Sequence, residues 1–256
     1  MLWPDLQEQA MSAIASASER VGPTLHIATV LSRAGWGDFS SEEKAWIARI
    51  EHRRHVTNSS KEVIHYQGFM PHSRDTVFEV VVGERSRVSS KPPAEAALLF
   101  SLVRQQKPAS CIEMGTCVGI SGSYIAAALR LNNRGKLVSL EGVAAFAEVA
   151  RRNFAALSLE GVAEVVVGPF HETLSYSLED ASPIDFIFID GHHDEQATTT
   201  YFETALPFLA PLSIAVFDDI NWSEGMKRAW SSISAAPQCT ARFSLRNFGI
   251  AVLRGA

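Results

Sequence analysis

The sequence has no excess of positive charge, and this restricts the partners that we expect it to have. Its 256 residues include 23 lysines and arginines against 28 aspartates and glutamates, which gives a formal net charge of −5. A domain that binds nucleic acid usually carries a basic surface that neutralises phosphates. We therefore expect no nucleic-acid partner.

Long apolar runs are missing as well. Stretches such as residues 94–103 fall far short of the ~20 consecutive apolar residues that a membrane-spanning helix needs. The first ten residues, MLWPDLQEQA, carry acids where a secretory signal peptide carries positive charge. These two absences predict a soluble, cytoplasmic protein with no membrane partner.

Cysteine is scarce, with Cys111, Cys117 and Cys239 as the only three. They form no C-x-x-C pair and no spacing typical of a metal site, which argues against a disulfide framework and favours a reducing compartment. A chain of this length with 46% hydrophobic residues buries enough surface to fold without a disulfide or a metal.

From residue 94 onward the sequence alternates short apolar strands with helices of ~10–15 residues. This alternation predicts an α/β domain with a doubly wound, mostly parallel sheet that helices cover on both faces. Only the four residues 246–249 separate the last two strands, so we expect these strands to pair antiparallel, with the last one reversed. The seven expected strands cover residues 110–114, 136–140, 163–167, 185–189, 213–217, 240–245 and 250–253.

Residues 1–88 have a different character. The stretch SSEE at 40–43 places hydroxyls before acids, a typical start of a helix, which we expect to continue towards Val56. Residues 76–82 fit a short strand or a helix fragment equally well. We expect residues 1–88 to form a mainly helical cover over the substrate side, or a dimerisation arm, for a ligand-binding domain of residues 89–256.

Acidic residues follow four of the first five strands of the predicted sheet. Open parallel sheets bind ligands at the carboxyl ends of their strands, and scattered surface acids do not usually line up there. We therefore place the ligand site at this edge. The acids are Glu113, Glu141, Asp190, and Asp218 with Asp219.

The turn after the first of these strands reads E-x-G-T-x-x-G, from Glu113 to Gly119. Its glycines allow a tight turn and a close approach of the backbone to a ligand. A dinucleotide-binding turn reads G-x-G-x-x-G, and Cys117 stands where the second glycine belongs, so the pyrophosphate pattern fails. An acid directly before the glycines suits a cation instead.

Glu141 lies 22 residues beyond Gly119, at the end of the next strand. A carboxylate in this position accepts hydrogen bonds from two ribose hydroxyls. The ligand that these features describe has a ribose and a positive charge but no pyrophosphate. S-adenosylmethionine meets all three conditions.

Three motifs extend this interpretation: EMGTCVGIS at 113–121, FIDGHH at 188–193 and FDDINWSEGM at 217–226. With them, residues ~88–254 resemble the class I S-adenosylmethionine-dependent methyltransferases, in particular a bacterial O-methyltransferase-like branch. The resemblance implies a Rossmann-like, seven-stranded sheet with a reversed last strand. It also implies transfer of a methyl group to an oxygen, with nitrogen second, of a small molecule.

The resemblance also implies which residues bind the cofactor. Glu113 would hold the methionine end, directly or through water, and shape the glycine turn, while Glu141 would bind the ribose. One departure concerns the adenine, because Pro169 replaces the usual acidic residue after Gly168, so the adenine would lie against Phe170 or His171. The full expected set is Glu113, Gly115, Thr116, Gly119, Ser121, Glu141, Gly142, Gly168, Phe170 and Asp190.

Catalysis would fall to His193, with Asp190 and Asp218 beside it. A histidine is a natural acceptor for the proton that a hydroxyl or amine acceptor must lose. His192 is the weaker alternative of the two neighbouring histidines. Loop histidines are also often satisfied by backbone groups, so a structural role for either remains open.

Likeness to catechol-type O-methyltransferases further implies a Mg²⁺ site made by Asp190, Asp218 and Asp219. Three hard oxygen ligands suit such an ion. In the alternative interpretation Asp190 and Asp219 cap helices, and Asp218 orients cofactor or substrate. Lys91, before two prolines, is either a solvated loop residue or a group near the cofactor edge.

Two other functions compete with the methyltransferase. A non-catalytic subunit that retains S-adenosylmethionine binding is disfavoured by the intact acids after strands 185–189 and 213–217. A nicotinamide-dependent dehydrogenase is disfavoured by Cys117. We expect a homodimer, and the sequence carries no signature of a particular acceptor.

Overall fold

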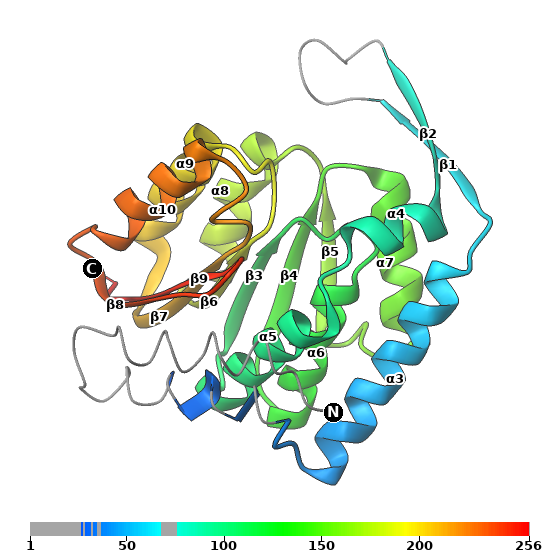
Figure 1. Cartoon of the computed structure of the whole chain (residues 1–256), viewed down its shortest axis with the longest axis horizontal. Helices are drawn as coiled ribbons and strands as arrows, with labels where there is room; N and C mark the ends of the chain where they lie inside the picture. Colours follow the sequence, from blue (N-terminus) through cyan, green and yellow to red (C-terminus); the bar gives the residue numbers. More distant parts are fainter. Residues whose placement is uncertain (1–26, 28, 32, 35–36, 68–75, 256) are drawn as a thin grey trace.

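A computed structural model describes residues 27, 29–31, 33–34, 37–67 and 76–255. A seven-stranded sheet crosses its centre, with helices in front of it and behind it (Figure 1). The strand order is β5-β4-β3-β6-β7-β9-β8. The strands are β3 (Ser110–Met114), β4 (Lys136–Glu141), β5 (Ala163–Val167), β6 (Ile184–Ile189), β7 (Leu209–Phe217), β8 (Cys239–Ser244) and β9 (Gly249–Leu253).

The predicted topology is confirmed. Strands β3 to β7 pair in parallel with their neighbours, and β9 runs antiparallel to both β7 and β8. From β3 the chain order rises outward to β5 on one side and through β6 to β7 on the other, so the strand order reverses between β3 and β6. In such sheets the crevice beyond this point of reversal is where ligands bind.

Helices cover both faces of the sheet because its strands are apolar on both sides. Phe186 and Phe188 pack into one core and Ile187 and Ile189 into the other, as the two-residue period of a strand requires. The first core receives α5 (Pro93–Gln106), α6 (Ile120–Asn132) and α7 (Ala144–Ala156). The second receives α8 (Phe170–Ala181), α9 (Glu195–Ala205), η2 (Leu206–Phe208) and α10 (Glu224–Ser234).

The predicted helix of the N-terminal region is α3 (Ser41–Asn58). Its start is a capping box, in which the Ser40 hydroxyl accepts from the Glu43 amide at 3.2 Å and the Glu43 carboxylate accepts from the Ser40 amide at 2.9 Å. The helix is fastened to the body of the protein by side chains. Arg53 donates to Asn153 of α7 at 2.6 Å, and Tyr124 of α6 donates to Glu51 at 2.7 Å.

The stretch 76–82, which the sequence left open between strand and helix fragment, contains a strand, whereas its partner strand and the helix that follows are not predicted from the sequence. β1 (Val63–Gln67) and β2 (Val77–Val81) form an antiparallel hairpin that extends away from the sheet (Figure 1). Tyr66 and Phe78 lie opposite each other in its register and stack with ring centroids 5.4 Å apart. α4 (Val82–Ser89) follows β2 directly and has no side-chain cap at its start.

Within the described residues, no helix is both long enough and apolar enough to cross a membrane. Expectations that concern residues 1–26 lie outside the described part of the chain.

Candidate active site

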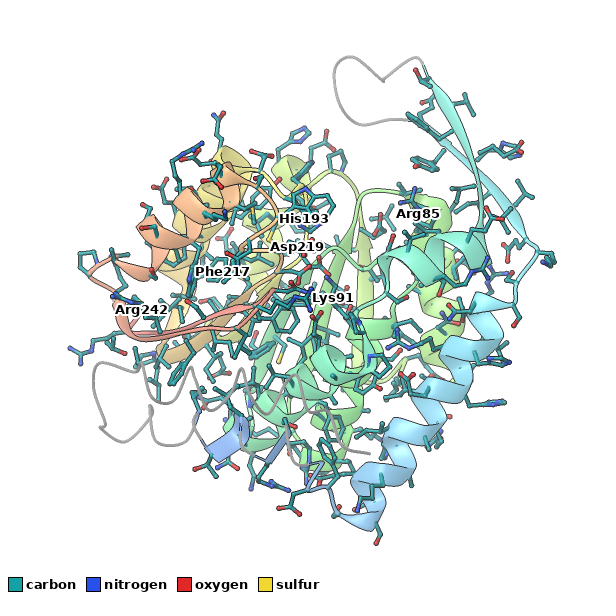
Figure 2. The ribbon with its side chains drawn as sticks, viewed as in Figure 1. Arg85, Lys91, His193, Phe217, Asp219 and Arg242 are labelled. Atoms are coloured by element: carbon teal, nitrogen blue, oxygen red, sulfur yellow. The ribbon has the colours of Figure 1, made fainter. Side chains whose placement is uncertain are left out.

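A cavity of about 890 Å³ lies at the carboxyl edge of the sheet. Its floor comes from the segments that follow β3, β4, β5, β6 and β7, and its roof from α4 and the segment up to Lys91. Figure 2 shows Lys91, His193 and Asp219 gathered at this edge, with Arg85 of α4 farther along it. The N-terminal region thus supplies one wall of the cavity.

The glycine turn brings two strand ends together. Gly115 has φ 103°, and a Cβ on it would lie 2.0 Å from the backbone oxygen of Asp190. The Asp190 amide in turn donates to the Met114 carbonyl at 2.9 Å. Gly119, with φ 78°, starts α6. Only glycine permits the approach at position 115, so the turn has the shape that the sequence predicts.

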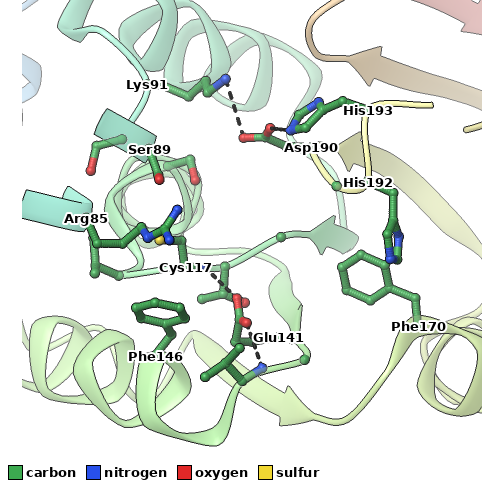
Figure 3. Close-up of a pocket in the computed structure, with 18 of the residues that line it drawn as sticks. Arg85, Ser89, Lys91, Cys117, Glu141, Phe146, Phe170, Asp190, His192 and His193 are labelled. Atoms are coloured by element: carbon green, nitrogen blue, oxygen red, sulfur yellow. Dashed lines mark hydrogen bonds and ion pairs between the residues drawn. The ribbon is translucent and has the colours of Figure 1, made fainter. Parts of the chain in front are cut away.

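Glu141 lines the floor of the cavity and is anchored by backbone groups. Its two carboxylate oxygens accept from the amides of Cys117, at 2.7 Å, and Val143, at 2.8 Å (Figure 3). Burial raises the pKa of Glu141, although these amides act in the opposite direction. The carboxylate therefore has a fixed orientation before any ligand arrives.

Glu113 lies behind the glycine turn and is fully buried. The Ser139 hydroxyl donates to its Oε2 at 2.6 Å, and its Oε1 has no hydrogen-bond partner among the described residues. A Cβ on Gly122 of α6 would lie 2.7 Å from Oε2. Burial raises the pKa of Glu113 to about 7. Its position suits support of the turn more than contact with a ligand.

The other expected cofactor residues divide between the cavity wall and the layer behind it. Those that line the cavity are Gly115, Thr116, Ser121, Glu141, Gly142, Phe170 and Asp190. Glu113, Gly119 and Gly168 are not among its lining residues.

The acids after β6 and β7 converge on the Lys91 ammonium and the His193 imidazole. The Lys91 ammonium donates to Asp218 Oδ2 and lies 3.6 Å from Asp190 Oδ2. His193 Nε2 lies 3.7 Å from Asp190 Oδ1, and its Nδ1 lies 3.6 Å from Asp219 Oδ2. Figure 3 shows Asp190 between Lys91 and His193. Asp218 is buried, and its second oxygen has no hydrogen-bond partner among the described residues.

These charges shift one another's pKa values. Burial acts to lower the pKa of Lys91, but Asp190 and Asp218 outweigh it and hold that pKa above the usual value. Burial, together with repulsion from Asp218, raises the pKa of Asp190 well above its usual value. Lys91 therefore stays charged throughout the physiological pH range.

The contact between Lys91 and the acids joins residues 127 positions apart, so the sequence alone does not reveal it. Two neighbours hold this segment in place. Arg54 of α3 donates to the Lys91 carbonyl at 2.7 Å, and Pro93 begins α5, where its fixed φ suits the first turn. Glu95, in the first turn of α5, accepts from Asn247 at 2.8 Å.

Aromatic side chains form another wall of the cavity. The His192 ring bonds the Tyr201 hydroxyl of α9 and meets the edge of Phe170, which gives this histidine a packing role. Burial lowers the pKa of His192. Trp222 stands at the rim and is 73% exposed. Phe146 lies opposite, beneath Arg85 (Figure 3).

The buried carboxyl of Glu113 makes the stability of the fold depend on pH. Because the folded pKa of about 7 exceeds the ordinary 4.5, the folded protein holds a proton that the unfolded chain releases, and stability falls as pH rises through this window. At pH 8 we expect the free energy of unfolding of Glu113→Gln to exceed that of wild type by at most about 3 kcal/mol. At pH 4.5 we expect the two proteins to be equally stable.

Chemical denaturation at both pH values measures this difference. The control is Glu164→Gln, because the Glu164 side chain on β5 is exposed. Equal slopes of stability against pH for wild type and Glu113→Gln would contradict the assignment of a buried, proton-binding Glu113.

Comparisons with known proteins agree with this geometry. A family model described as a methyltransferase domain matches residues 112–220. A catechol O-methyltransferase from Niastella koreensis is 31% identical over 156 residues, which cover 60% of this chain and 68% of that protein. A catechol O-methyltransferase from Mycobacterium tuberculosis is 31% identical over 136 residues, which cover 53% of this chain and 58% of that one.

Among solved structures, the O-methyltransferase from Bacillus cereus in complex with SAH has a TM-score of 0.60 with this chain. The match covers 82% of this chain and 91% of that chain at 23% identity, which is a likeness of fold.

The doubly wound sheet with one reversed strand, and the cavity beyond its point of reversal, match the Rossmann-like methyltransferase fold. The chain belongs to the class I S-adenosylmethionine-dependent O-methyltransferases. It transfers the methyl group of S-adenosylmethionine to a small-molecule acceptor. This excludes the nicotinamide cofactor that the sequence left as an alternative.

Proposed function

We propose that S-adenosylmethionine binds along the floor of the cavity, with its ribose on Glu141. The cavity volume of about 890 Å³ is ample for this cofactor and an acceptor together. The bare backbone at Gly115 lets the ends of β3 and β6 meet, which holds the glycine turn and Asp190 together at the edge of the cavity. Ser121 and Thr116 face the same space, and Phe170 offers an apolar wall for the adenine.

Glu141→Ala tests the ribose contact. We expect it to weaken S-adenosylmethionine binding by ~1–3 kcal/mol, the range for a lost hydrogen bond to a charged group. Titration calorimetry measures the affinity, and Glu164→Ala on the adjacent strand β5, whose side chain is exposed, serves as the control. Unchanged affinity in Glu141→Ala would contradict the contact.

The acceptor is proposed to bind at the rim, beside His193. When bound, S-adenosylmethionine supplies a methyl group whose C–S bond breaks as a bond to the acceptor oxygen forms, which leaves a neutral thioether. The acceptor hydroxyl must lose its proton in this reaction, and His193 is the side chain that can take it. Asp190 and Asp219, within 3.7 Å and 3.6 Å of its two ring nitrogens, orient the imidazole.

We propose a phenolic hydroxyl, of the catechol type, as the acceptor group. The two curated relatives reported above are catechol O-methyltransferases, and the cavity rim here combines an exposed aromatic side chain, Trp222, with His193 and the acids. The observation that carries the proposal is the convergence of His193 with three carboxylates and Lys91 beside the glycine turn.

Incubation with S-adenosylmethionine and a panel of catechol, dihydroxybenzoate, phenol and aromatic amines tests this acceptor class by mass spectrometry. We expect mono-O-methylated catechols as the main products. Methylation of the amines alone, or of none of the panel, would contradict it.

A Mg²⁺ ion on Asp190, Asp218 and Asp219 stays a prediction of the resemblance. Carboxylate oxygens suit the ion, and ligand atoms of Asp190, His193 and Asp218 lie within 4.8 Å of one another. The Lys91 ammonium, however, contacts Asp218 and lies 3.6 Å from Asp190, at the side of these carboxylates where an ion would bind. With the ammonium in this position, the donor set does not fit a divalent ion.

We further propose that the boundary near residue 88 separates a substrate-side cover from the cofactor-binding domain. Tyr66, Arg85 and Val88 line the cavity from that side, which supports the role of a cover. The homodimer and the cytoplasmic location stay predictions from the sequence.

A further inference from the structure

We propose that Lys91 is the built-in cation of this active site, and that it replaces the divalent metal for which the three carboxylates would otherwise provide ligands. The inference rests on the proposed function, because it concerns the charge beside the acceptor oxygen. It differs from that function in predicting methyl transfer that requires no metal.

The position of the ammonium carries the first part of the argument. Lys91 reaches the acid cluster from the opposite wall of the cavity, donates to Asp218 and approaches Asp190 to 3.6 Å. Both contacts use the Oδ2 atoms of these two carboxylates. A divalent ion bound to those two oxygens would meet a like charge within a few ångströms, and the two cations would exclude each other.

The surroundings of Lys91 keep the ammonium where it is. Its side chain is 13% exposed, so it is not a solvated loop residue. Pro92 and Pro93 restrict the backbone on one side, and Arg54 holds the Lys91 carbonyl at 2.7 Å. Glu95, bonded to Asn247, adds a negative charge beneath the segment. Without the ammonium, and with no ion in its place, Asp218 would be buried with no described hydrogen-bond donor.

The balance of charge points the same way. The carboxyl groups of Asp190, Asp218 and Asp219 repel one another, which adds to the effect of burial in raising the pKa of Asp190. Lys91 lies on one flank of the cluster and His193 on the other. Lys91 also lines the cavity, so its charge is available to an acceptor oxygen that has given up its proton. In this arrangement Lys91 stabilises the oxygen anion electrostatically, and His193 is the proton acceptor.

Metal binding gives a test that does not depend on activity. The probe is Mn²⁺, titrated into metal-free protein and followed by electron paramagnetic resonance. We expect wild type to bind no Mn²⁺ specifically at the ion concentrations at which protein sites for such ions are usually filled. Lys91→Met should bind Mn²⁺ at least about tenfold more tightly, because the carboxylates lose their competitor. Lys91→Arg should behave like wild type.

Lys136→Met is the matched control, since Lys136 is exposed at the opposite, amino end of β4. If Lys91→Met does not fold, the double variant Lys91→Met with Asp218→Asn restores the charge balance, and the wild-type titration still decides. One specific Mn²⁺ in wild type, lost in Asp218→Asn, would overturn the proposal.

A second readout is methyl transfer in excess EDTA, with catechol as the acceptor. We expect the wild-type rate to be unchanged by EDTA and by added Mg²⁺. Abolition by EDTA with recovery in Mg²⁺ would overturn the proposal. If catechol is not methylated in any condition, the acceptor assignment fails, while the Mn²⁺ titrations still test the role of Lys91 independently.

Discussion

Gly115→Ala is expected to abolish S-adenosylmethionine binding and to destabilise the fold by about 2–5 kcal/mol. A Cβ at this position would lie 2.0 Å from the Asp190 carbonyl oxygen, and φ 103° is unfavourable for any L side chain. Because the obstacle is backbone, the ends of β3 and β6 would have to move apart. That movement displaces the glycine turn and Asp190 together, on which both the cofactor and the acceptor depend.

Calorimetric titration with S-adenosylmethionine and chemical denaturation measure the two effects. Gly161→Ala is the control, because a Cβ there meets no described atom within 4 Å. We expect this control to bind and fold like wild type. A Gly115→Ala protein with wild-type cofactor affinity would show that the turn does not carry the binding site.

His193→Ala is expected to lower kcat by ~10²–10⁴-fold, the usual range for loss of a general base. The affinity for S-adenosylmethionine should change little, because the proposed cofactor contacts are on other side chains. Rates of catechol methylation, with kcat and KM determined separately, measure the effect. His55→Ala, exposed on α3, is the control. An increase of KM with an unchanged kcat would make His193 a residue that binds the acceptor instead of a base.

Much of the fold could be predicted because its strands are short, apolar and bounded by turns. The expected strands at 110–114 and 163–167 match β3 and β5 residue for residue, and the four-residue connection before β9 correctly predicts an antiparallel pair. β2 lies in the stretch 76–82 that fits a strand or a helix fragment, whereas β1, its pairing with β2, and α4 escape prediction for a physical reason. The strands of the hairpin depend on cross-strand pairing, and α4 begins without a side-chain cap.

The site divides in a similar way. The acids at the strand ends are predictable because the carboxyl ends of parallel strands lie along one edge. The contact of Lys91 with Asp218 could not be predicted, because it joins residues 127 positions apart that only the folded chain brings together. The burial of Glu113 follows from alternation in β3, since Ile112 and Met114 pack on the other face and Glu113 turns towards α6.

The central claim is that this edge of the sheet holds the adenosyl group, and a crystal structure with S-adenosylhomocysteine tests it most directly. We expect both ribose hydroxyls within hydrogen-bond distance of the Glu141 carboxylate, the adenine against Phe170, and the sulfur turned towards Asp190. A product molecule bound away from Glu141, or at another surface altogether, would contradict the account.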